Sequence, residues 1–344
     1  MEGELSRLAL YGVCLMLGVV PVLAFLGTLV LLDSYKLVRL RRVLALVFSG
    51  AFVAFICLYL NPWLIRTFGI ETETYTRLIG PWIEELLKGS IVALALYRRR
   101  IGFLVDASVW GFAIGAGFAA FENTHFFIVL AEPKPILWIL RGFGTAIMHG
   151  GATALMAVVA KQLADRFSSV APPVILPGLL LATLVHSAFN HFYLSPSLST
   201  LLLLVVLPLL FYLVFRVSEN ATHRWLGTGF DSDQELLEVI NSGRVSEIRM
   251  GRYLEELKKR FPPETVVDML CLIRLHLELS IRAKGVLLMQ KAGFDVPRDE
   301  EVEERLVELR HLERNVGTTG MIALHPIFRM SHHDLWQLHM LRDN

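Results

Sequence analysis

The sequence has few charged residues. Only 19% of its 344 residues are Asp, Glu, Lys or Arg, whereas an average soluble domain has about 25%. The net charge is +1, so there is no excess of basic residues for binding nucleic acid. Hydrophobic residues make up 54% of the chain and its mean hydropathy is +0.53, which excludes a disordered or collagen-like protein. This composition is typical of an integral membrane protein.

Cysteine is also scarce, with three residues and no CxxC spacing, which excludes a disulfide framework. Cys14 and Cys57 lie in apolar runs, where we expect structural thiols. The first seven residues are acidic and the apolar run after them is too long for a signal peptide. We therefore expect the first run to be retained as a transmembrane helix.

The charges are distributed unevenly along the chain. Residues 1–218 hold 16 of the 33 basic and 11 of the 32 acidic residues, whereas residues 219–344 hold 17 basic and 21 acidic ones. We therefore predict a membrane domain over 1–218, followed by a helical soluble domain of unknown role over 219–344. Apolar residues recur in this second domain at three- and four-residue spacing, as an amphipathic helix requires: Val266, Val267, Leu270, Ile273, Leu277 and Ile281.

Seven segments of the first domain are apolar enough, at about 20 residues each, to cross a bilayer. The sequence thus predicts an all-α polytopic bundle of about seven spans: Leu8–Leu32, Val43–Ile65, Leu78–Tyr97, Val105–Leu130, Ile136–Ala160, Val174–Tyr193 and Leu198–Phe215. Basic residues gather in alternate loops, as at Arg39–Arg42 and Arg98–Arg100. By the positive-inside rule these loops are cytoplasmic, which places the N-terminus outside and the domain after the last span in the cytoplasm.

Polar residues interrupt four consecutive spans, the third to the sixth. An ionised side chain inside a span costs roughly 2.5–3.5 kcal/mol on insertion scales, so such groups face one another or water. At about 1.5 Å per residue, Glu84, Glu122 and His186 each lie about 9–12 Å below the outer face, and His149 lies near mid-membrane. The sequence therefore predicts one polar site, mostly in the outer half of the bilayer, formed by Glu84, Glu85, Lys88, Glu122, Asn123, Arg141, His149, His186 and Asn190.

The residue types of this site suit hydrolysis of an amide without a Ser or Cys nucleophile. A carboxylate that shares a proton with an imidazole can activate water at near-neutral pH. One of the adjacent residues Glu84 and Glu85 is expected to pair with Lys88, which leaves the other for this role. Glu122 and His149 would complete the group that binds water, while His186 and Asn190 would hold the oxyanion. Arg141 would either balance a carboxylate or touch the substrate.

Four motifs in order resemble those of the PrsW family of intramembrane proteases. Glu84-Glu85-Leu-Leu-Lys88 is similar to its EExxK motif, and Gly117-Phe118-Ala-Ala-Phe-Glu122-Asn123 is similar to its second motif. Arg141 followed by His149-Gly150 resembles the third motif, and His186-Ser-Ala-Phe-Asn190 the HxxxN fourth. The resemblance covers about residues 75–195. The wider superfamily contains the type II CAAX prenyl proteases and Abi proteins, which differ in having EExxxR and a His at the position of Glu122.

The resemblance implies a glutamate-dependent intramembrane peptidase in a bacterial or archaeal cell membrane, although the family has also been classed as metallopeptidase. It implies a membrane-anchored protein substrate that is cut on its extracytoplasmic side, as in the first cleavage of an anti-sigma factor. By analogy with the superfamily, Glu84 is the base, and Phe118, Asn123, Lys88 and Arg141 support the site. The resemblance says nothing about residues 219–344.

Two alternatives remain open from the sequence. A zinc enzyme would use Glu85, Glu122, His149 and His186 as ligands, but the chain has no HExxH motif, so no metal cofactor is favoured. A proton-coupled transporter would also bury Glu, His, Lys and Arg, but we find no inverted repeat. A non-enzymatic seven-helix receptor is a weaker third possibility. A protease requires a carboxylate and an imidazole around one water, whereas a transporter requires a path to both faces.

Overall fold

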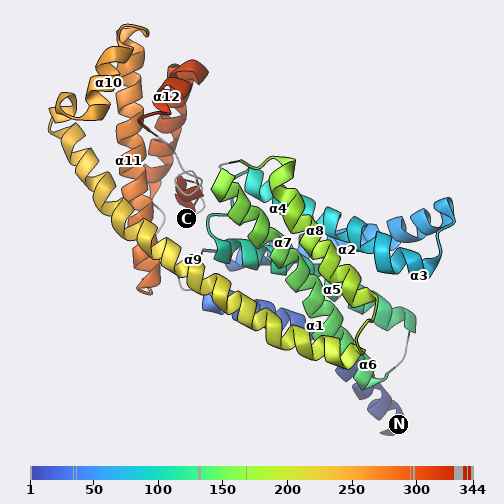
Figure 1. Cartoon of the computed structure of the whole chain (residues 1–344). Helices are drawn as coiled ribbons and strands as arrows, with labels where there is room; N and C mark the ends of the chain where they lie inside the picture. Colours follow the sequence, from blue (N-terminus) through green and yellow to red (C-terminus); the bar gives the residue numbers. More distant parts are fainter. Residues whose placement is uncertain are drawn as a thin grey trace. The chain divides into compact units, whose positions relative to one another are not determined.

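The computed structural model describes residues 2–33, 35, 37–130, 133–167, 169–294, 296, 299–328, 336–338 and 340–341, and over these it contains helices and no strand. The chain divides into two compact units, residues 1–218 and 219–344, and the division falls within a single long helix, α9 (Figure 1).

The first unit is a bundle of apolar helices joined by short connections. In chain order its elements are α1 (Glu2–Leu32), α2 (Leu40–Phe68), α3 (Thr72–Thr74), the π-helix η1 (Tyr75–Ile79), α4 (Gly80–Tyr97), α5 (Leu104–Leu130), α6 (Pro135–Ile139), the π-helix η2 (Leu140–Thr145), α7 (Ala146–Phe167), α8 (Pro172–Asn190) and α9 (Pro196–Asn241). Each predicted span corresponds to one of these helices or, for the fifth, to the continuous run α6–η2–α7.

Six of the described helical segments are long and apolar enough to cross a membrane, one fewer than the number of predicted spans. The difference is α4, the predicted third span. It has only 18 residues, and three of them are the charged residues Glu84, Glu85 and Lys88. The charged residues that lower the apolar content of α4 are the same ones that the sequence predicts for the polar site.

Helix α5 forms the core of the first unit. It is buried over most of its length and packs against α1, α2 and α7 (Figure 1). Glycines allow this close packing. A side chain at Gly115 would collide with the backbone of α7 at His149, and one at Gly117 would collide with the backbone of α2 at Val47. These contacts fix α5 beside α2 and beside α7, which carries His149.

The second unit has a separate apolar core. It contains the end of α9, the short helix η3 (Arg244–Glu247) and three α-helices: α10 (Arg249–Leu257), α11 (Pro263–Lys291) and α12 (Glu300–Leu324). On α11 the predicted apolar residues Val266, Ile273 and Leu277 are buried. Val267 is instead 58% exposed, because its position one residue after Val266 turns it about 100° away from the core.

Candidate active site

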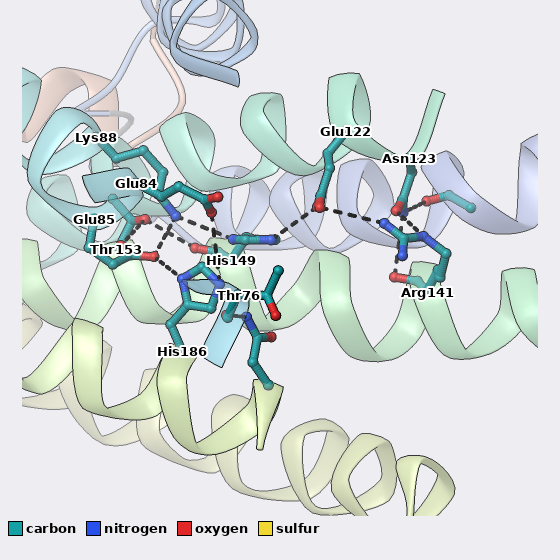
Figure 2. A network of polar contacts seen from close by, with 12 residues as sticks. Thr76, Glu84, Glu85, Lys88, Glu122, Asn123, Arg141, His149, Thr153 and His186 are labelled. Carbon is teal, nitrogen blue, oxygen red and sulfur yellow. Dashed lines mark hydrogen bonds and ion pairs between the residues drawn. The ribbon is translucent and has the colours of Figure 1, made fainter. Parts of the chain in front are cut away.

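Polar side chains from four parts of the first unit meet inside the bundle (Figure 2). Helix α4 contributes three of them and α5 two, and the others come from the η2–α7 run and α8: Glu84, Glu85, Lys88, Glu122, Asn123, Arg141, His149 and His186. Glu85 and Lys88 are completely buried, and His149 and His186 are each 2% exposed. The structure thus brings together eight of the nine polar residues that the sequence predicts for one site.

Glu85 lies at the buried side of this cluster and has partners on both oxygens. Its Oε1 accepts hydrogen bonds from Lys88 Nζ at 2.5 Å and from His186 Nδ1 at 2.9 Å, and its Oε2 accepts one from the Thr153 hydroxyl at 3.1 Å. Burying two charges is favourable only when their remaining hydrogen-bonding positions are satisfied, as they are here. Glu85 is therefore held in one position by three different elements.

Glu84 lies at the other side of the cluster and is more open. Its side chain is 16% exposed, and its Oε2 lies 3.9 Å from His186 Nε2. The Asn61 amide donates a hydrogen bond to Glu84 Oε1 at 3.1 Å, and the Tyr75 hydroxyl donates one to Asn61 Oδ1 at 2.8 Å. Because Glu85 occupies His186 Nδ1, the lone pair on Nε2 of a neutral His186 is directed toward Glu84.

His149 lies between Lys88 on α4 and Glu122 on α5 and contacts both. Its Nδ1 lies 3.3 Å from Lys88 Nζ, and its Nε2 lies 3.1 Å from Glu122 Oε2. A charged lysine has only donors, so Nδ1 accepts, and the hydrogen of the neutral ring is on Nε2 and is donated to Glu122. The ring packs edge-on against His186 at 4.6 Å and lies 4.9 Å from Phe118, whose face also carries the Lys88 ammonium.

Arg141 anchors the far end of the cluster. Its Nη2 lies 3.7 Å from Glu122 Oε1, and its Nε donates a hydrogen bond to Asn123 Oδ1 at 2.9 Å. The Asn123 amide in turn donates to the Gly18 carbonyl of α1 at 2.7 Å, and the guanidinium lies over the Phe126 ring. Arg141 thus balances the charge of Glu122, and through Asn123 it is linked to the backbone of α1.

Two π-helices lie immediately before the helices that carry the central residues: η1 precedes α4, and η2, which contains Arg141, precedes α7. Such segments are rare in proteins as a whole, but they occur often at functional sites.

The end of α8 is hydrogen-bonded to η1. Ser187 Oγ donates to the Arg77 carbonyl at 2.6 Å, and Asn190 Nδ2 donates to the Thr76 carbonyl at 3.0 Å. Asn190 therefore donates one hydrogen bond to the backbone of η1, and its predicted role in the oxyanion site stays a prediction.

Three further residues that contact the cluster, directly or through one another, are not among those predicted from the sequence: Asn61, Tyr75 and Thr153. Asn61 is an amide near the end of the predicted second span, and Tyr75 lies just outside a span, where tyrosine is common for other reasons. Thr153 had a usable signal, since it follows His149 by four residues and so lies on the same face of its helix.

The donor atoms of Glu84, His149 and His186 all lie within 4.8 Å of one another, as is suitable for a metal ion. Two histidines and a glutamate are a known ligand set for catalytic zinc, and the hydrogen bond from His186 to Glu85 is of the kind that orients a metal-binding imidazole. The donor chemistry therefore fits a divalent metal. The set differs from the predicted one in having Glu84 in place of Glu85 and Glu122. His149 would have to give up its contact with Lys88 or with Glu122 to bind the metal, because both of its ring nitrogens are engaged.

A cavity of about 240 Å³ adjoins the cluster between α2 and α5. Glu84 and Glu122 both line it, together with Asn61. The cluster thus has a completely buried side around Glu85 and an accessible side around Glu84. An arrangement of this kind can bind a water molecule between carboxylate and imidazole groups and admit a reacting group from the cavity.

Comparison with known protein families gave one match. The model of the PrsW family intramembrane metalloprotease matches residues 39–216, which contain all eight residues of the cluster. Comparisons with curated proteins and with solved structures gave no match.

Proposed function

This chain belongs to the PrsW family of intramembrane metalloproteases, and we propose that it hydrolyses a peptide bond of a membrane-anchored protein in the outer half of the bilayer. The observation that carries the proposal is the convergence of Glu84, His149 and His186 next to a cavity that a second carboxylate, Glu122, also lines. Two carboxylates on the cavity, with two buried imidazoles beside them, can bind a water, remove its proton and return that proton to a leaving amine.

In this proposal Glu84 is the general base. Its side chain is 16% exposed, whereas that of Glu85 is fully buried. The water gives a proton to Glu84 while its oxygen bonds to the carbonyl carbon of the substrate. The carbon–nitrogen bond then breaks, and the proton passes from Glu84 to the departing amine, so that Glu84 is ionised again. Proton transfer of this kind contributes about 10²–10⁴-fold to a rate.

The other residues of the cluster position the water. The His149 imidazole is held by Glu122 and Lys88, and the His186 imidazole is held by Glu85. These contacts hold both rings next to Glu84, so no conformational change is needed to bring them there. Glu85 and Lys88 act through these contacts as positioning residues. Asn190 donates one N–H to the Thr76 carbonyl and has no assigned role in this proposal.

The same three residues, Glu84, His149 and His186, would hold a divalent metal such as zinc. A zinc ion at this position would lower the pKa of a bound water and polarise the substrate carbonyl. Cleavage assays with the purified chain distinguish activation of the water by glutamate alone from activation by a metal. We expect cleavage to persist in 1,10-phenanthroline when glutamate alone activates the water. Stoichiometric zinc, together with loss of cleavage in chelator and recovery on adding zinc, would assign the metal mode.

For the substrate, we propose a single-span protein cut near its extracytoplasmic side, in a bacterial or archaeal cell membrane. The basic loops at Arg39–Arg42 and Arg98–Arg100 support this side, since the positive-inside rule predicts from them that Glu84 lies in the outer half of the bilayer. An anti-sigma factor is the particular substrate that the resemblance to the PrsW family implies. The second unit, residues 219–344, has no catalytic role in this proposal.

Quantitative proteomics of cells tests the function even though the substrate is unidentified. Cells that express the intact chain are compared with cells that express Glu84→Gln, with Glu71→Gln as the matched control because Glu71 is exposed and lies outside the cluster. We expect one or more membrane proteins to lose their released extracytoplasmic fragments only with Glu84→Gln. Identical fragments in all three strains would overturn the proposal and would favour the transporter alternative, which cleaves no protein.

A further inference from the structure

The cavity beside the cluster has two chemically different parts. Its wall is mainly apolar, with Ala54, Cys57 and Leu58 from α2 and Phe118 and Phe121 from α5. Its polar lining consists of the carboxylates Glu84 and Glu122 together with Asn61, Thr76 and His125. An apolar group in this cavity would therefore lie directly beside the proposed base.

The packing of α2 against α5 explains why the cavity is there. The two helices touch at Gly50 and Gly117, where any side chain would collide with the facing backbone. Further along α2, the small residues Ala54 and Cys57 line the cavity on the side that faces α5. Both are almost completely buried, at 5% and 3% exposure, so they form a fixed wall.

Phe118 joins the apolar wall to the polar cluster. One part of its ring lines the cavity, while the ring centre lies 4.6 Å from Lys88 Nζ and 4.9 Å from the centre of the His149 ring. The ring therefore separates the apolar cavity from the buried charges. A group bound against Phe118 is one side chain away from the groups that are proposed to handle the water.

The size of the cavity limits what it can hold. Its 240 Å³ is below the roughly 300–1,000 Å³ of pockets for small-molecule ligands, whereas about 150 Å³ is enough to bind a benzene ring. The cavity is therefore large enough for one large apolar side chain. Glu84 and Glu122 would repel an acidic side chain, which would also lose its hydration there.

We propose that this cavity is the subsite for the substrate side chain next to the scissile bond, that it selects a large apolar residue such as Leu, Met or Phe, and that Ala54 and Cys57 set its depth. The inference rests on the proposed peptidase function and adds the substrate preference of the same site. In a protease a side-chain pocket beside the reacting groups fixes which peptide bond is presented to them.

The test uses the purified full chain in proteoliposomes with a pool of single-span reporter proteins whose residues near the outer membrane surface are randomised. Mass spectrometry of the products gives the residue preference on each side of the cleaved bond. Ala54→Leu and Cys57→Leu each fill part of the cavity. Ala45→Leu is the matched control, because it makes the same change on the same helix at an exposed position outside the cavity.

We expect the intact chain and Ala45→Leu to prefer large apolar residues and to disfavour Asp and Glu at one position next to the cleaved bond. Both cavity variants should lower the ratio of Phe to Ala at that position about tenfold or more, as a change of a few methylene groups does in an apolar pocket. This ratio is measured within one preparation, so a partial loss of folded enzyme does not change it.

Cleavage by the intact chain with the same residue profile for all three variants would overturn the subsite and leave the proposed function standing. The absence of any cleavage by the intact chain, in a preparation that is folded and inserted, would overturn the proposed function and the subsite with it.

Discussion

Glu84 and Glu85 are neighbours in sequence, but they lie in two different environments within the same cluster. Around Glu85 every polar contact is completely buried, and Lys88, His186 and Thr153 satisfy both of its oxygens. Around Glu84 the cluster meets a cavity, and the Asn61 amide donates a hydrogen bond to one of its oxygens. The difference teaches that a buried ion pair gives the site its rigidity, whereas the proposed chemistry needs a carboxylate that a substrate can reach.

Removing the charge of Glu84 is the change with the largest expected effect on cleavage. In Glu84→Gln the side chain keeps its shape, but it can no longer accept a proton, so we expect cleavage to fall about 10²–10⁴-fold. Stability should change little, because Glu84 lies at the edge of the cluster. Single-turnover cleavage and thermal unfolding in the same detergent measure the two effects, and cleavage within a few-fold of the intact chain would refute the role of Glu84.

Removing the charge of Glu85 should act on stability first. Glu85→Gln leaves Lys88 charged and buried without its counterion, which costs about 3–5 kcal/mol when a buried pair is broken on one side. We expect the free energy of unfolding to fall by about this amount. The double variant Glu85→Gln/Lys88→Met removes both charges and should recover most of the loss. If Glu85→Gln is as stable as the intact chain, the structural role of the pair is wrong.

The Tyr75–Asn61–Glu84 chain should give the smallest effect. Tyr75→Phe removes the hydroxyl that orients Asn61, and Asn61 then holds Glu84 less firmly. We expect kcat to fall about 3–10-fold with little change in KM, since a net hydrogen bond is worth about 0.5–1.5 kcal/mol. Tyr59→Phe is the matched control, because Tyr59 is 64% exposed on the same helix as Asn61. Equal kcat values for the two variants would contradict a positioning role for Tyr75.

Much of the fold could be predicted because its signals are local. Apolar run length predicts the membrane helices of the first unit. The two π-helices could not be predicted, since they differ from α-helix only in the register of backbone hydrogen bonds. For the same reason the bonds from α8 to η1, including that of Asn190, were not foreseen.

The candidate site, like the fold, could be predicted from the sequence only in part. Helical rise places Glu84, Glu122 and His186 at similar depths, so their convergence follows from sequence and bilayer geometry together. The partner of Lys88 does not follow, because a lysine can reach a glutamate three or four residues before it equally well on a helix. The pair formed is Lys88–Glu85, where His186 and Thr153 from two other helices supply the remaining hydrogen bonds.

The sequence by itself determined that this chain is a helical membrane protein with one set of ionisable groups inside its spans, because the cost of burying charge makes such groups conspicuous in an otherwise apolar chain. Only the tertiary structure decided which glutamate is locked into an ion pair and which one reaches the cavity. That choice depends on contacts between α4 and the helices α2, α7 and α8, which are far from it in sequence and whose side chains either satisfy a carboxylate or leave it accessible.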